Sequence, residues 1–211
     1  MSTQHPVPVQ PIMAGVVPTG LTVAEAIANY KARSAESSSV LRQAISYMID
    51  NNIRTDFAND SYSDALVLTE MMLSRTNKSL RVLSGDGEGG FFYILNTFLS
   101  DAITRIAQND GCAHFILIAK TIPKYLLDLQ AMYPHKFSVK LAGTDTPIRH
   151  FIVSDTKMAR VEEPHKALRE NSKSNEIKAR VYFNEPTVSS FLEKQFDSMW
   201  AIVSNYEVNK A

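Results

Sequence analysis

Short apolar runs alternate with longer helical patterns along the middle of this sequence, and this alternation constrains the fold more than any other feature. Residues 80–84 have the composition of a strand, and 114–119 form a continuous apolar run, which is typical of a strand buried on both faces. Residues 91–106 and 125–132 carry apolar side chains at helical spacing. Strands joined by helices pair in parallel through right-handed crossovers. The sequence therefore predicts an α/β domain.

Further along, strand patterns follow one another without helices between them. Residues 137–141 and 177–183 alternate between apolar and other side chains, and a tight turn separates two short apolar strands at 150–154 and 158–161. Pro186 then begins a long last helix, since proline suits the first helical turn. We therefore expect a mixed sheet that is flanked by helices on both faces.

The first third of the chain has a different character. Residues 1–20 contain four prolines, which disfavour a helix and predict a flexible arm, or one that lies across a partner subunit. Residues 21–78 carry apolar side chains at helical spacing, and Thr22 with Glu25 forms a capping box at their start. We expect this helical region to pack as one unit with the α/β domain at 79–205.

Composition and charge limit the functional classes. The 22 basic and 22 acidic residues leave no net charge, which does not favour nucleic-acid binding, because such binders must neutralise phosphates. The single cysteine, Cys112, excludes an internal disulfide and fits a reducing compartment. No apolar run reaches the roughly 18 residues of a membrane span, and the N-terminus does not resemble a signal peptide. We expect a cytoplasmic protein without membrane contact.

Two local patterns lack the residues that their chemistry needs. The glycine-rich segment 85–90 follows a strand and opens a helix, where anions bind. However, Asp86 and Glu88 repel phosphate, and the lysine of a phosphate-binding loop is absent. Cys112 and His114 are two residues apart, but no second pair has the spacing of metal ligands. The sequence therefore predicts neither a cofactor nor a metal.

Polar side chains gather around the two short strands that follow residue 149. His150 and Asp155 bracket the first strand, and we expect them to lie close to the polar residues of the second. Arg160 and Glu162 share one face there, because strand side chains alternate between faces. The structural alternative is that Arg160 pairs with Asp155 or Glu162 to hold the hairpin together. The candidate binding residues are His150, Asp155, Arg160, Glu162, His165 and Lys166.

The order of strands and helices from residue 80 to 203 resembles one half of a phospholipase D superfamily protein. Segment 148–155, Ile-Arg-His-Phe-Ile-Val-Ser-Asp, resembles the signature strand of that family. Segment 181–185 and the helix after it, which ends in Phe-Asp-Ser-Met-Trp, resemble the closing strand and helix of such a half. The resemblance covers about 120 residues and implies a phospholipase D-like mixed sheet.

The reactive residues of the family signature are replaced in this chain. The signature is His-x-Lys, four residues and then Asp, where the histidine is the nucleophile and the lysine binds phosphate. With Asp155 at the aspartate, Ile148 stands at the nucleophile and His150 at the lysine. An isoleucine cannot form a phosphohistidine intermediate. Because the family assembles two halves around one active site, the resemblance also implies a homodimer with residues 150–162 near the two-fold axis.

These replacements favour binding over catalysis. We expect a catalytically degenerate module, more a binder than an enzyme, that takes up a protein partner or a small anionic, phosphate-containing ligand. One alternative is a divergent phosphodiesterase or nuclease that uses His150, with Asp155 as its second catalytic residue. Another is a protein–protein adaptor that acts through the N-terminal helices and the proline-containing arm.

Overall fold

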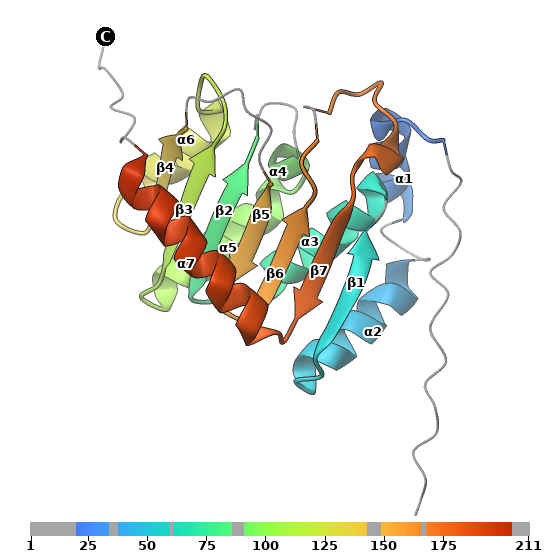
Figure 1. The fold of residues 1–211 in the computed structure, drawn as a ribbon, viewed down its shortest axis with the longest axis horizontal. Helices are drawn as coiled ribbons and strands as arrows, with labels where there is room; N and C mark the ends of the chain where they lie inside the picture. Colours follow the sequence, from blue (N-terminus) through green and yellow to red (C-terminus); the bar gives the residue numbers. More distant parts are fainter. Residues whose placement is uncertain are drawn as a thin grey trace, which may run out of the picture.

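A seven-stranded sheet runs through the centre of the protein (Figure 1). The computed structural model describes residues 20–33, 38–59, 61–85, 91–142, 149–165 and 168–203, so all of the predicted arm except Gly20 lies outside the described residues. In sheet order the strands are β1 (Thr55–Asn59), β7 (Ala179–Phe183), β6 (Met158–Glu162), β5 (Phe151–Ser154), β2 (Ser79–Ser84), β3 (Cys112–Leu117) and β4 (Phe137–Leu141). The α-helices are α1 (Val23–Arg33), α2 (Ser38–Asp50), α3 (Tyr62–Arg75), α4 (Phe91–Ile94), α5 (Asn96–Gln108), α6 (Lys124–Met132) and α7 (Pro186–Ile202).

The pairing of the strands follows from their connections. β2 and β3 pair in parallel through α4 and α5, and β3 and β4 pair in parallel through α6. The other neighbouring strands pair antiparallel, and β5 and β6 form a tight hairpin. The predicted mixed α/β sheet is therefore confirmed.

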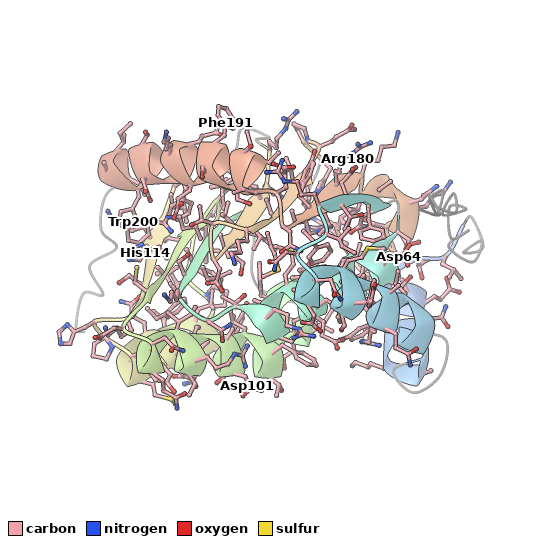
Figure 2. All side chains as sticks on the ribbon, turned by 90° about the horizontal axis from the view of Figure 1, so that it is seen from below. Asp64, Asp101, His114, Arg180, Phe191 and Trp200 are labelled. Carbon is pink, nitrogen blue, oxygen red and sulfur yellow. The ribbon has the colours of Figure 1, made fainter. Side chains whose placement is uncertain are left out.

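Helices cover both faces of the sheet, as predicted. α7 crosses one face diagonally, and α3, α5 and α6 lie on the other face (Figures 1 and 2). Neighbouring strand residues point to opposite faces, so Val82 and Phe115 enter the larger core, while Leu83 and Ile116 enter the smaller core under α7. The sheet is therefore the middle layer of the protein, with one hydrophobic core on each of its faces. No helix in the described part of the chain is long and apolar enough to cross a membrane.

β1 was not among the expected elements, although it lies within the region predicted to be helical. It pairs antiparallel with β7 and forms one edge of the sheet. Phe57 packs edge-on against Phe183 with ring centroids 6.1 Å apart, and Asp56 forms a 2.8 Å ion pair with Arg180. The N-terminal region therefore contributes a strand to the sheet as well as three helices.

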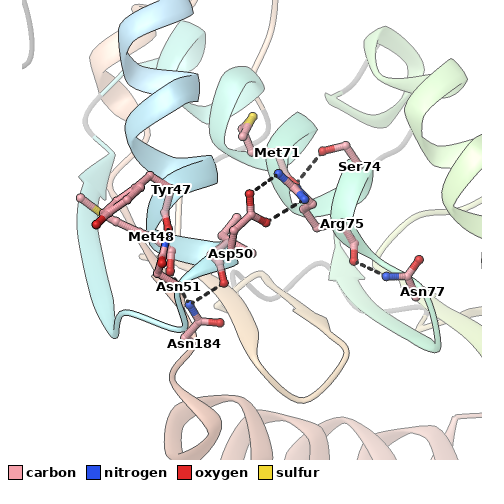
Figure 3. Close-up of polar contacts among 10 residues, drawn as sticks. Tyr47, Met48, Asp50, Asn51, Met71, Ser74, Arg75, Asn77 and Asn184 are labelled. Carbon is pink, nitrogen blue, oxygen red and sulfur yellow. Dashed lines mark hydrogen bonds and ion pairs between the residues drawn. The ribbon is translucent and has the colours of Figure 1, made fainter.

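Side-chain hydrogen bonds fix the ends of several elements. The Thr22 backbone N–H donates to Glu25 at 2.8 Å, and the Glu25 N–H donates to the Thr22 hydroxyl at 3.3 Å, which confirms the predicted capping box. Asn184, between β7 and α7, donates to the Met48 carbonyl oxygen near the end of α2 (Figure 3). Asp50, at the end of α2, pairs with Arg75 at the end of α3 in the same view.

Candidate functional site

A polar cluster lies at the open base of the β5–β6 hairpin. His150 directly precedes β5 and Glu162 ends β6, and the Glu162 N–H donates to the His150 carbonyl oxygen at 2.9 Å. β5 runs antiparallel to β2, so His150 lies beside Gly85, where an added Cβ would approach the imidazole to 3.2 Å. The cluster thus lies at the carboxyl end of the parallel strand β2, the edge where open α/β sheets bind ligands.

Glu162 is the centre of this cluster. Its Oε2 atom lies 3.2 Å from Nδ1 of His150 and 2.8 Å from Nε2 of His165. Its other oxygen, Oε1, accepts a hydrogen bond from Arg160. We call His150, Arg160, Glu162 and His165 the hairpin-base cluster. One carboxylate thus joins one guanidinium and two imidazoles.

Arg160 is the most deeply buried residue of the hairpin-base cluster. Only 2% of the residue is exposed, and its guanidinium lies 5.0 Å from the centre of the Phe91 ring in a cation–π contact. Its Nε and Nη2 atoms are buried without a hydrogen-bond partner among the described residues. A buried donor without a partner costs free energy, so Arg160 retains unused capacity to bind an acceptor.

The protonation of the cluster follows from its burial and charges. Burial alone would raise the pKa of Glu162, but the Arg160 charge and the hydrogen bonds of His150 and His165 hold this pKa well below its usual value. Burial and the charge of Glu162 raise the pKa of Tyr62 to about 12 against the opposing effect of Arg160. At neutral pH, the site therefore contains an ionised carboxylate and a neutral phenol.

Tyr62 and Phe91 lie beside the cluster but were not identified from the sequence as residues of the site. They come from the first turns of α3 and α4, and their rings meet edge-on with centroids 5.8 Å apart. Tyr62 lies 89 residues before the start of the hairpin at Phe151, and no local motif marks either side chain. Only the packing of α3 and α4 against the sheet brings them to Arg160.

Asp155 lies at the opposite end of the hairpin from the cluster, contrary to the expected proximity. Its carboxylate accepts hydrogen bonds from the backbone N–H groups of Asn77, Lys78 and Ser79 at 2.8, 2.8 and 2.9 Å. Each strand residue adds roughly 3.3 Å, so the five steps from His150 to Asp155 span about 16 Å. Asp155 therefore holds the start of β2, and Arg160 pairs with Glu162 instead.

Two other positions of interest lie outside the described residues. They are Lys166, a predicted binding residue, and Ile148, which aligns with the family nucleophile. The same holds for 86–90, which comprise all of the glycine-rich segment except Gly85.

His114 occupies the opposite face of the sheet from Arg160. It stacks on Trp200 of α7 with ring centroids 4.5 Å apart, and the two side chains meet between α7 and the sheet in Figure 2. Burial, followed by the charge of Arg81, lowers the pKa of His114. His114 therefore contributes to the packing of α7 and is separate from the hairpin-base cluster.

Comparisons with known proteins identify the fold. No protein-family model and no curated protein matches this sequence. Among solved structures, the chain is similar to TrmBL2, an archaeal chromatin protein, with 13% identity and a TM-score of 0.52 over 85% of this chain and 68% of that one. It is also similar to Nuc, a phospholipase D family member from Salmonella typhimurium, with 12% identity and a TM-score of 0.50 over 72% of this chain and 98% of Nuc.

NucT from Helicobacter pylori matches over the same shares of the two chains, with 12% identity and a TM-score of 0.47. Similarity at these identities concerns the fold and does not transfer an activity. The chain therefore has a phospholipase D-like fold, as its order of strands and helices predicts.

Proposed function

We propose that this chain is a phospholipase D-like module that binds a small anionic, phosphate-containing ligand at the hairpin-base cluster without hydrolysing it. The observation that carries the proposal is the buried Arg160, whose Nε and Nη2 donors lack partners among the described residues. These donors form a planar fork that matches two oxygens of a phosphate group. The pairing of Arg160 with Glu162 leaves this part of the fork unused.

The two histidines give the ligand its first contacts. The side chains of His150 and His165 are 17% and 14% exposed, whereas that of Arg160 is 2% exposed. A phosphate group that arrives from solvent therefore meets the imidazoles first. The charges of Arg160 and Glu162 offset each other, so this pair adds no net charge that would repel an anion.

The absence of hydrolysis follows from the signature strand. Ile148 stands at the position of the family nucleophile and offers no atom that could attack phosphorus. His150 stands at the position of the phosphate-binding lysine. This position retains a nitrogen donor, which suits binding without a covalent step.

Calorimetric titration with inorganic phosphate, pyrophosphate and a nucleoside monophosphate tests the proposal in buffer that contains a chelator. We expect binding of at least one of these anions by the unaltered chain. His150→Gln, His165→Gln and Arg160→Lys should each weaken it by about tenfold or more, the effect of losing one charge-assisted hydrogen bond. His135→Gln and Arg180→Lys are matched controls, because both residues are exposed and lie outside the cluster. No binding, or an equal loss in the controls, would contradict the proposal.

A divergent phosphodiesterase is the second candidate, and one observation favours it. The Glu162 carboxylate contacts Nδ1 of His150 and so orients the ring, as a third group orients a catalytic histidine. This candidate predicts turnover of bis-p-nitrophenyl phosphate or single-stranded DNA that His150→Gln abolishes and His135→Gln preserves. Such a result would replace the binding-only proposal.

We also propose that the module forms a homodimer through the surface around the hairpin-base cluster. The described residues form one phospholipase D-like unit, whereas family sites are assembled from two such halves. Light scattering on the eluting protein should give twice the chain mass of 23.5 kDa. A monomer at micromolar concentration would refute this part of the proposal.

A further inference from the structure

Three side chains of the hairpin-base cluster have the chemistry and spacing of metal ligands. One ring nitrogen of His150, one ring nitrogen of His165 and a carboxylate oxygen of Glu162 all lie within 4.8 Å of one another. The two imidazoles meet the same atom, Oε2 of Glu162, at 3.2 and 2.8 Å. The rings are nearly perpendicular, with an interplanar angle of 81° and centroids 5.1 Å apart. Both histidines therefore direct a nitrogen toward one point from different sides.

These distances are compatible with a single ion. Ligand atoms that are about 2.0–2.2 Å from a tetrahedral Zn²⁺ lie roughly 3.3 Å apart. The two nitrogen–oxygen distances are close to this value, so small shifts of the side chains would accommodate an ion. Two imidazoles with one carboxylate suit Zn²⁺, Co²⁺ or Fe²⁺, whereas Mg²⁺ and Ca²⁺ prefer oxygen ligands alone.

The fold holds this ligand set in place. The backbone hydrogen bond between Glu162 and His150 fixes two of the ligands at the base of one hairpin. Arg160 holds the second oxygen of Glu162, and outer hydrogen bonds of this kind orient the carboxylates that bind metals. The site thus needs little rearrangement to accept a cation.

We infer that His150, Glu162 and His165 bind one divalent transition-metal ion of the Zn²⁺ class. The charges of Arg160 and Glu162 cancel, so the ion leaves the cluster with a net charge of about +2. Three protein ligands leave a coordination position for water or for an anionic oxygen. The metal deepens the proposed function, because it would add a cationic contact for a phosphate oxygen to the donors of Arg160, but the metal site itself rests only on the three ligands.

The competing explanation is a hydrogen-bonded network that stabilises the hairpin without a metal. Both explanations place the imidazoles at the same oxygen, so metal titration must separate them. The experiment uses the full chain, freed of metal with a chelator and dialysed into buffer without phosphate. Zn²⁺ is titrated by calorimetry, and Co²⁺ is followed by its visible absorption, which reports tetrahedral coordination by nitrogen and oxygen.

His150→Gln and His165→Gln are the decisive variants, because glutamine can still hydrogen-bond to Glu162 but is a poor metal ligand. We expect one Zn²⁺ per unaltered chain, and each variant should weaken the affinity by about 100-fold or more, since altering even an outer-shell partner costs 10–100-fold. His135→Gln and Cys112→Ser serve as controls for metal bound elsewhere, and circular dichroism verifies the fold of each variant.

Absence of Zn²⁺ and Co²⁺ binding by the folded chain would overturn the inference. Unchanged affinity in both histidine variants, or a loss confined to Cys112→Ser, would overturn it as well. Phosphate titration in chelator gives an independent outcome. Phosphate binding without metal binding retains the proposed function and rejects the metal, whereas the reverse result rejects the phosphate ligand and retains the metal.

Discussion

The side-chain amide of Asn184 donates a hydrogen bond of 3.0 Å to the backbone carbonyl of Met48, 136 residues earlier in the chain. The same amide lies 3.1 Å from the carbonyl oxygen of Ile53. Asn184 also has a φ of 55°, a left-handed conformation that asparagine tolerates better than most residues. One residue thus turns the chain from β7 into α7 and holds the segment between α2 and β1.

Substitution of Asn184 should separate these two roles. Asn184→Gly keeps the backbone conformation but loses the hydrogen bonds, so we expect a loss of about 1–2 kcal/mol in the free energy of unfolding. Asn184→Ala should lose roughly 1 kcal/mol more, because alanine is strained at positive φ. Urea denaturation of both variants measures the difference. Equal stability of the two variants would show that backbone strain at this position is negligible.

Asp155 should prove structural. Its carboxylate holds three backbone N–H groups at the start of β2, so Asp155→Asn should lower the free energy of unfolding by about 2 kcal/mol. Asparagine tolerates the positive φ of 51° at this position, so the loss reports the hydrogen bonds. Phosphate and Zn²⁺ affinities of the folded variant should match those of the unaltered chain. A selective loss of ligand affinity with normal stability would instead assign Asp155 to the site.

Removal of the Glu162 charge should destabilise the fold strongly. Glu162→Gln leaves the buried Arg160 without its counter-charge, and breaking such a pair costs about 3–5 kcal/mol. The pKa of Glu162 is lower in the folded state than its usual 4.5, so its stabilising effect is complete above pH 4.5 and is lost as the pH falls toward the folded value. Urea denaturation at neutral and at acidic pH should therefore show that the free energy of unfolding of the unaltered chain falls with pH. The fall should be smaller in Glu162→Gln.

His114 should produce a second, milder pH dependence. Its pKa in the folded state is lower than the usual 6.5, chiefly through burial. As the pH falls through 6.5, His114 is protonated in the unfolded chain at a higher pH than in the folded chain. The free energy of unfolding therefore falls as the pH drops. His114→Gln should flatten this part of the profile, and His135→Gln should leave it unchanged. An unaltered slope in His114→Gln would reject this assignment.

Much of the fold could be predicted because its signals are local. Apolar strands separated by helical patterns predict β2, β3 and β4 and their parallel pairing, and the closely spaced strands predict the β5–β6 hairpin. β1 gave no comparable signal, because Thr55–Asn59 is short and Phe57 is its only large apolar residue. Its partner β7 lies far along the chain, and only tertiary pairing makes this segment a strand.

The candidate site was predictable to the extent that the hairpin determines it. The two-residue period of a strand correctly places Arg160 and Glu162 on one face, and antiparallel pairing places His150 beside them. The same geometry separates Asp155 from the cluster, because His150 and Asp155 lie at opposite ends of the extended strand β5. The contact between His165 and Glu162 depends on the loop after β6, whose path has no periodic signal in the sequence.

The place of β1 at the edge of the sheet also has a consequence for biosynthesis. Asp56 leaves the ribosome long before Arg180, its ion-pair partner 124 residues later in the chain. Until β7 is synthesised, β1 has no neighbouring strand, and the apolar face of Phe57 lacks the ring of Phe183 that covers it. Contacts between such distant segments form slowly, because a long loop must close first. The sheet is therefore completed only after β7 has been synthesised, and a nascent chain that stops before β7 would carry an exposed strand on which aggregation can begin.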